Sequence, residues 1–221
     1  MTLDPILRHS LFIAGTDTGV GKTWVAVRLL RALVGSGLRA AGMKPVAAGA
    51  VMTPAGLRND DALALAGAGN VALPYETLNP YCLAQATSPH IAARNAAISI
   101  EIELITSKYA LIAAKSDVIV VEGAGGWLAP VGDPALPGTT GPTMADVAAA
   151  LALPVVLVVG MRLGCISHAL LTADSIRARG LQMAGWIANP IDAEFLPASA
   201  GYAAYVDALE RRLPAPRLQV H

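Results

Sequence analysis

The chain has 221 residues, 54% of them hydrophobic, and its 16 Lys and Arg balance its 16 Asp and Glu, so the formal net charge is zero. This length predicts one domain over residues 1–221 with a sizeable core. A chain without a diffuse basic field is not expected to bind nucleic acid or an anionic membrane surface, so any phosphate site must be local.

The sequence also lacks the usual signs of export. Residues 1–10 have no basic region leading into an apolar stretch, so we expect a cytoplasmic protein. The most apolar run, residues 147–161, is shorter than the roughly 20 residues of a membrane span, and Pro154 divides it. Cys82 and Cys165 have no C-x-x-C spacing, which predicts reduced thiols rather than a zinc site or a disulfide framework.

Short apolar runs alternate with helical patterns along the chain. Strands without polar alternation are usually covered on both faces, and helix-length connections indicate crossovers. The pattern predicts an α/β fold with a doubly wound, mainly parallel sheet and helices on both faces. We expect strands at residues 11–15, 40–46, 118–121, 155–159 and 184–188, and helices at 22–34, 60–65, 100–114, 144–151, 167–179 and 200–213.

A glycine-rich segment from Gly15 to Thr23 follows the first expected strand and opens the first expected helix. Backbone N–H groups in such a loop point at phosphate oxygens, and the helix N-terminus adds partial positive charge. Lys22 would then reach the β- and γ-phosphates, and the Thr23 hydroxyl would ligate magnesium. Thr16 stands where G-x-x-x-x-G-K-[ST] has its first glycine, so the loop is a deviant P-loop. The alternative is a glycine-rich turn with a chance Lys-Thr.

Charged residues end two of the apolar strands, Lys44 in GMKPV and Glu122 in VIVVEGAGG. Ligands of parallel sheets bind outside the carboxyl ends of the strands, so both are site candidates, although either could be a solvated charge. Asp61 follows Asp60 at an expected helix start, where Asp60 is the better N-cap candidate. Spacing does not separate the two. Thr23, Glu122 and one of these aspartates would suffice for a magnesium ion bridging the phosphates.

The segment from residue 130 to 142 is dense in Pro and Gly, which predicts an irregular surface loop beside the site, either a lid or a long turn. Trp127 is expected in the core. His168 and Cys165, near a helix start, are more often structural than catalytic.

Several segments together make the chain resemble the dethiobiotin synthetases over nearly its whole length. For this family the deviant P-loop is the expected form. The segments are Gly15-Thr16-Asp17-Thr18, Val20-Gly21-Lys22-Thr23, Lys44-Pro45-Val46, Arg58-Asn59, Asp61-Ala62-Leu63, Asn79-Pro80-Tyr81, Thr87-Ser88-Pro89-His90, Val121-Glu122-Gly123-Ala124-Gly125-Gly126-Trp127, Leu163-Gly164-Cys165, Ala184-Gly185-Trp186 and Ala188-Asn189.

The resemblance implies a magnesium- and ATP-dependent ligase that works as a homodimer. In this family 7,8-diaminononanoate reacts with carbon dioxide to a carbamate, whose oxygen attacks the γ-phosphate of ATP, and the second amine then closes the ureido ring. A carbamate and a triphosphate are both anionic, so cations must be in place before they react. Lys22, Lys44 and Mg²⁺ are the implied cations.

The resemblance also implies the role of each site residue. Lys44 and Lys22 are the expected catalytic residues, Asn189 reads the adenine, and Tyr205 reaches the partner subunit's substrate carboxylate. Ala48 replaces a family Ser or Thr, which implies one substrate hydrogen bond fewer. The implied metal ligands are Thr23, Asp61 and Glu122, the substrate-binding residues are Thr18, Lys44, Ala48, Gly125 and Tyr205, and the nucleotide-binding residues are Thr18, Gly19, Val20, Gly21, Lys22, Thr23, Asp61, Glu122, Gly123, Ala124, Gly125, Asn189 and Pro190.

Two other functions fit a deviant P-loop on this fold. A switch ATPase of the partitioning or septum-positioning class commonly has a second lysine early in the loop, where this chain has Asp17 and Thr18. An amide-forming ligase of cobyrinate type would need a glutaminase domain. The ligase that forms dethiobiotin is therefore the favoured hypothesis.

Overall fold

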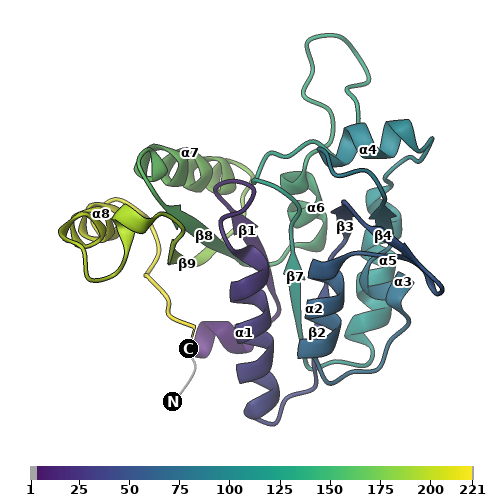
Figure 1. Ribbon diagram of the computed structural model, residues 1–221, viewed down its shortest axis with the longest axis horizontal. Coiled ribbons are helices and arrows are strands. Elements are labelled where there is room, and N and C mark those ends of the chain that lie inside the picture. The colour runs from purple at the N-terminus through teal and green to yellow at the C-terminus, as the bar shows by residue number, and fades with distance from the viewer. Residues whose placement is uncertain (1–3, 221) are drawn as a thin grey trace.

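The computed structural model describes residues 4–220 of the chain. Its centre is a sheet of five parallel strands in the order β2-β7-β1-β8-β9 (Figure 1). The order reverses beside β1, so the sheet is doubly wound, as the sequence predicts. The strands are β1 (Leu11–Gly15), β2 (Ala40–Met43), β7 (Val118–Glu122), β8 (Val155–Met161) and β9 (Met183–Pro190).

Alternate side chains of the strands enter two hydrophobic clusters, one on each face of the sheet. Leu11 and Ile13 of β1 belong to one cluster, whereas Phe12 and Ala14 belong to the other. Side chains of a strand point alternately to its two faces, so an apolar residue is needed at every position. All residues of β1, β7 and β8 are buried, which explains why these segments are apolar throughout, except at Glu122, the last residue of β7.

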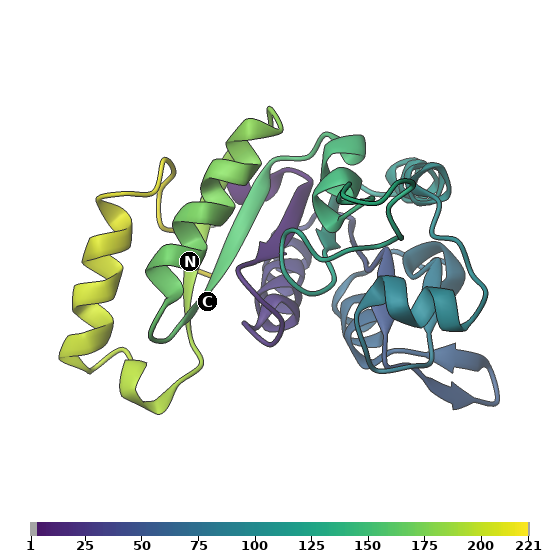
Figure 2. The ribbon, with the colours of Figure 1, turned by 90° about the horizontal axis from the view of Figure 1, so that it is seen from above.

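Helices cover both faces of the sheet. The cluster of Leu11 and Ile13 is covered by the 3-10 helix η1 (Pro5–Arg8), α1 (Lys22–Gly35) and α2 (Asp60–Ala68), and the opposite cluster by α5 (Ile102–Ala113), α6 (Met144–Leu151), α7 (Cys165–Ala178) and α8 (Ala200–Glu210). Figure 2 shows α8 at one end of the molecule and the segments between β2 and α4 at the other. Within residues 4–220, none of the helices combines the length and apolar character that a membrane crossing requires.

Several small elements between β2 and α5, and one before α8, were not predicted. They have three to seven residues each, which is too short for a recognisable periodicity. A parallel pair joins β3 (Val46–Ala48) to β6 (Tyr81–Leu83), and a hairpin joins β4 (Val51–Thr53) to β5 (Gly56–Arg58). The others are α3 (Tyr75–Leu78), α4 (Pro89–Asn95) and the 3-10 helix η2 (Ala193–Phe195).

The expected strand at residues 40–46 is wrong in extent, because β2 ends at Met43 and Val46 begins the separate strand β3. Pro45 has no N–H to donate to a ladder, so it interrupts the pairing. The backbone N–H of Lys44 donates instead to the carbonyl of Leu78, at 2.8 Å from nitrogen to oxygen. Lys44 thus lies just beyond the carboxyl end of β2.

The N-cap of α2 also differs from the expectation. Asn59, not Asp60, is the N-cap, and its side chain accepts a hydrogen bond from the N–H of Ala62 at 3.2 Å. Asp60 is the first helical residue, where its negative charge still favours the helix N-terminus. The six predicted helices are otherwise confirmed, with ends that differ by no more than three residues.

The Pro- and Gly-rich loop is confirmed as irregular surface structure. An isolated bridge between Pro130 and Thr143 closes its base, and residues 133–140 are exposed. Figure 1 shows the loop projecting beside α4.

Candidate active site

The loop from Gly15 to Thr23 connects β1 to α1 at the carboxyl edge of the sheet. Gly19 and Gly21 have φ values of 73° and 90°, which side chains other than glycine rarely adopt. A Cβ atom on Gly21 would also lie 2.1 Å from the Nδ2 atom of Asn189. Gly21 is the N-cap of α1 and provides no side-chain cap, so the first N–H groups of the helix are open to an anion.

Lys22 is a buried cation inside this loop. Its ammonium donates a hydrogen bond to the carbonyl of Asp17 at 2.9 Å, which keeps the side chain folded over the loop. Burial, and then repulsion from Lys44, lower the pKa of Lys22 to about 8. A polyanionic ligand beside the ammonium would raise this pKa again and favour the charged form.

Lys44 lies between two carboxylates that come from different elements. Its Nζ atom is 2.5 Å from Oε1 of Glu122, at the end of β7, and 3.1 Å from Oδ2 of Asp61, in the first turn of α2. The carbonyl of Gly123 accepts a third hydrogen bond at 3.4 Å. The structure therefore brings together three of the predicted residues, and it places Asp61 rather than Asp60 in the cluster.

The opposite charges of this cluster stabilise one another's ionised forms. Burial opposes the charge of Lys44, but the nearby carboxylates of Glu122 and Asp61 outweigh it and raise the pKa of the lysine. Partial burial likewise opposes the charge of Asp61, yet the ammonium of Lys44 and a hydrogen bond from Thr23 hold its pKa below the ordinary value. Lys44 therefore stays charged at neutral pH and holds a positive charge at the edge of the sheet.

The oxygen atoms around Glu122 fit a magnesium ion. Thr23 Oγ1 donates to Glu122 Oε1 at 2.8 Å, while Glu122 Oε2 is fully buried without a hydrogen-bond partner. A buried oxygen without a partner costs free energy, and a cation beside it would remove that cost. Asp61 adds a second carboxylate. Within residues 4–220 no cluster of three or more His, Cys, Asp and Glu side chains is placed to hold a metal ion.

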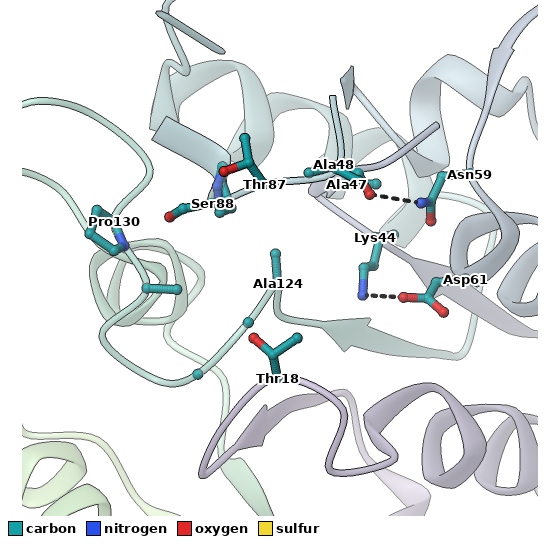
Figure 3. Close-up of a pocket in the computed structure, with 15 residues that line it drawn as sticks. Thr18, Lys44, Ala47, Ala48, Asn59, Asp61, Thr87, Ser88, Ala124 and Pro130 are labelled. Atoms are coloured by element: carbon teal, nitrogen blue, oxygen red, sulfur yellow. Dashed lines mark hydrogen bonds and ion pairs between the residues drawn. The ribbon is translucent and has the colours of Figure 1, made fainter. Parts of the chain in front are cut away.

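A cavity of about 540 Å³ opens beside this cluster (Figure 3). Lys44 and Asp61 lie on one side of it, Thr18 of the P-loop lies below, and Ser88 lies on the other side. The predicted substrate residues Thr18, Lys44, Ala48 and Gly125 all line the cavity, together with Ala47, Asn59, Asp61, Ala86, Thr87, Ser88, Pro89, Ala124, Gly126, Ala129 and Pro130. Ala48 presents a methyl group here, and its carbonyl accepts a hydrogen bond from Asn59 at 3.3 Å.

Asn189 and Pro190, at the end of β9, lie at a separate cavity of about 380 Å³. The Asn189 amide donates to the carbonyl of Val20 at 2.8 Å, which ties this cavity to the P-loop. Trp24 of α1 and Tyr202 of α8 also line it. A nucleotide in the P-loop could place its base here.

Tyr205 is the one predicted substrate-binding residue that lines neither of these two cavities. It lies on α8, where its ring meets the ring of Phe195 edge-on with centroids 4.8 Å apart. Its expected role toward a partner subunit stays a prediction. Trp127 is buried as expected, with its ring edge-on to Phe12.

Arg162 is a site residue that the sequence did not indicate. Its guanidinium lies 2.6 Å from Oδ2 of Asp17, and Oδ1 of the same carboxylate accepts the N–H of Thr18 at 2.7 Å. This pair fixes the first half of the P-loop. Its position in the sequence could have indicated this role. Arg162 directly follows β8 and thus lies at the same edge of the sheet as Lys44.

The doubly wound sheet and the loop that ends in Lys22-Thr23 define a P-loop nucleotide-binding protein. Comparison with solved structures agrees at the level of fold. The signal recognition particle receptor FtsY from Elizabethkingia anophelis is similar with a TM-score of 0.50 and 14% identity, over 97% of this chain and 62% of that one.

Sequence comparisons define the family. Residues 9–218 match a family model described as an AAA domain. The chain is 47% identical to the ATP-dependent dethiobiotin synthetase of Vibrio vulnificus (strain YJ016), over 96% of this chain and 88% of that relative. It is 51% identical to the one of Xanthomonas oryzae pv. oryzae (strain PXO99A), over 83% and 79%. The chain belongs to the dethiobiotin synthetase family.

Proposed function

We propose that this chain is an ATP-dependent dethiobiotin synthetase of biotin biosynthesis, which makes dethiobiotin from 7,8-diaminononanoate, carbon dioxide and ATP. The observation that carries the proposal is the single sheet edge where the P-loop, the cluster of Lys44 and the 540 Å³ cavity meet. Family membership supports the same activity.

The reaction has three bond-forming steps. One amine of the substrate attacks carbon dioxide and gives a carbamate. A carbamate oxygen then attacks the γ-phosphorus of ATP, the bond to the ADP oxygen breaks, and a carbamic-phosphoric anhydride forms. The second amine attacks the carbonyl carbon of the anhydride, the carbon–oxygen bond to phosphate breaks, and the ureido ring closes with release of inorganic phosphate.

Lys22 and Lys44 hold the two anionic reactants in this account. Lys22 and the free N–H groups of α1 bind the β- and γ-phosphates, and Lys44 binds the carbamate from the cavity side. Two negative groups repel each other in a site with little water, so these fixed cations lower the barrier to their approach.

Thr23, Asp61 and Glu122 are the side chains that would hold magnesium. A bound Mg²⁺ neutralises charge on the β- and γ-phosphate oxygens. The unpartnered Oε2 atom of Glu122 and the oxygen-only donor set support this assignment.

The remaining predicted residues fall into two groups. We assign the triphosphate to residues 18–23 and to Gly123, Ala124 and Gly125. We assign the base to Asn189 and Pro190, which line the 380 Å³ cavity. We assign the diamine to the cavity lined by Thr18, Ala48 and Gly125. Tyr205 would complete this site in a homodimer, and we place the protein in the cytoplasm.

Release of ADP provides the test of this function. We expect ADP to form only when diaminononanoate and bicarbonate are both present with ATP and magnesium. A switch ATPase would release ADP at the same rate without the two substrates. That result would contradict the proposal.

A further inference from the structure

The hydroxyl of Ser88 makes an unexpected contact at the start of α4. Ser88 is the N-cap of this helix, and an N-cap serine usually accepts a hydrogen bond from an N–H of the first turn. Here its side chain makes no such bond. Its Oγ atom lies 2.9 Å from Nδ1 of His90 instead, so the hydroxyl is held by the imidazole rather than by the helix.

The Ser88–His90 pair joins two cavities. Ser88 lines the 540 Å³ substrate cavity, on the side opposite Asp61 (Figure 3). His90 lines a different cavity of about 400 Å³, which also contains Arg94 and Glu101. A proton that leaves the substrate cavity through this pair would therefore arrive at a second opening of the protein.

The reaction must remove protons from both amines. An alkyl ammonium has an ordinary pKa of about 10.4, so amines reach a site at neutral pH mostly in protonated form. An ammonium nitrogen carries three hydrogens, and the same nitrogen in the ureido ring carries one. Each nitrogen must therefore lose two protons, the first of them before it can attack carbon.

Few groups on the wall of the substrate cavity can accept these protons. Among the described residues that line it, the titratable ones are Lys44 and Asp61. Lys44 Nζ and Asp61 Oδ2 hold each other at 3.1 Å, so neither is free to take a proton from the amine. Ser88 is the wall residue whose hydroxyl contacts an imidazole nitrogen, that of His90.

We propose that Ser88 and His90 form a proton relay that deprotonates the diamine, an inference that rests on the proposed function. An N–H bond of the amine breaks and its proton passes to Ser88 Oγ, while the Ser88 O–H proton passes to His90 Nδ1. The imidazolium then releases the proton on Nε2 to water in the second cavity and becomes neutral. A turn of the neutral ring about its Cβ–Cγ bond then presents an unprotonated nitrogen to Ser88 for the next proton. Ser88 contacts the substrate in this scheme, and His90 is a positioning residue that acts through it.

The charged side chains that share the second cavity with His90 have other partners. Arg94, one turn further along α4, is paired with Asp133 of the Pro- and Gly-rich loop at 3.3 Å. Glu101, at the start of α5, accepts a hydrogen bond from the hydroxyl of Ser99. The backbone N–H of His90 donates to the carbonyl of Pro130, which fixes the backbone between the two cavities.

The test compares the pH profile of His90→Asn with that of the wild type. The Asn side chain can still accept the Ser88 hydroxyl but cannot hold a proton, so it separates orientation from proton transfer. We expect turnover at pH 7 to fall on the order of 10²-fold, the usual effect of losing a general base. The deficit should shrink toward pH 10, because the amine then arrives unprotonated. Each ratio is taken at one pH, so effects shared by both proteins cancel.

Matched variants control this experiment. Ser88→Ala should show the same narrowing deficit, Ser88→Thr should recover most of the turnover, and His9→Asn, at an exposed position, should behave as the wild type. A deficit that is equal at every pH, or no deficit in His90→Asn and Ser88→Ala, would overturn the relay. A wild type that ignores the diamine would instead overturn the proposed function, so the two failures are distinct.

Discussion

The ammonium of Lys44 is buried between Glu122 and Asp61. Removal of this single charge tests whether turnover can be lost while ATP binding is kept. We expect Lys44→Ala to lower turnover about 10³-fold, because the carbamate loses its fixed counter-charge. The Kd for ATP, measured by calorimetry, should change little, since the P-loop and Lys22 are intact. Lys115→Ala, at an exposed position, is the control. Full turnover in Lys44→Ala would remove this residue from the mechanism.

Glu122 is the residue on which the metal assignment depends most. Glu122→Gln keeps the shape of the side chain but removes its negative charge, so we expect the magnesium concentration for half-maximal activity to rise severalfold. Because Lys44 then has only Asp61 as a charged partner, we also expect a loss of about 3 kcal/mol of stability. Activity titrations and thermal melting measure the two effects. An unchanged magnesium titration would refute the metal role of Glu122.

Residues of this cluster could be anticipated because the carboxyl ends of parallel strands share one edge. Glu122 ends β7 and Lys44 follows β2, so the topology alone places them together. The contacts of Ser88 with His90 and of Arg162 with Asp17 depend instead on the paths of loops, which no periodicity in the sequence encodes.

At the scale of elements, α6 is held by a capping box at its N-terminus. The Asp146 carboxylate accepts the N–H and the hydroxyl of Thr143, both at 2.7 Å, and it pairs with Arg179 of the segment after α7 at 2.6 Å. We expect Asp146→Ala to lower the free energy of unfolding by about 1–2 kcal/mol, or roughly 2–8 °C in Tm. Asp174→Ala, which removes an exposed pair with Arg177, should change Tm very little.

The same carboxylate gives a pH dependence of known sign. Partial burial opposes its charge, but the hydrogen bonds from Thr143 and the charge of Arg179 prevail and lower the pKa of Asp146. Because the pKa is lower in the folded state, the ionised carboxylate stabilises the protein at pH values above its ordinary pKa of about 4. This stabilisation is lost as the pH falls through the lowered pKa. Melting curves of wild type and Asp146→Ala should thus differ at pH 7 and converge toward pH 2. A constant difference would contradict this.

The long helices and strands were predictable because each is long enough to show its hydrophobic pattern in the sequence. Five apolar runs and six amphipathic or apolar helices appear within three residues of their expected ends, except at Pro45, where a missing N–H splits one strand into two. The elements around the substrate cavity, such as β3, β6 and α4, are too short for such patterns. Their positions are set by packing against the larger sheet.

At the scale of the whole molecule, the predicted role of Tyr205 depends on a second subunit. It does not line the substrate cavity of its own chain, so its expected contact with the substrate carboxylate must cross a dimer interface. We expect sedimentation velocity to give twice the chain mass of 22.6 kDa. A species of the chain mass at all concentrations would contradict the dimer.

A mixing experiment tests the same arrangement functionally. Lys44→Ala and Tyr205→Ala are each expected to be nearly inactive. A heterodimer of the two has one intact site, so mixing under conditions of subunit exchange should recover roughly a quarter of the wild-type activity. No recovery would mean that each chain completes its own site.

We propose that one sheet edge joins a carbamate to the γ-phosphate of ATP. Bicarbonate labelled with ¹⁸O can follow this transfer, in short reactions without carbonic anhydrase, by ³¹P NMR of the released phosphate. We expect one ¹⁸O atom from the labelled substrate in each inorganic phosphate, because the carbamate oxygen stays with the phosphorus when the ring closes. Phosphate whose fourth oxygen comes from water would show simple hydrolysis of ATP and would rule out a carbamate as the attacking group.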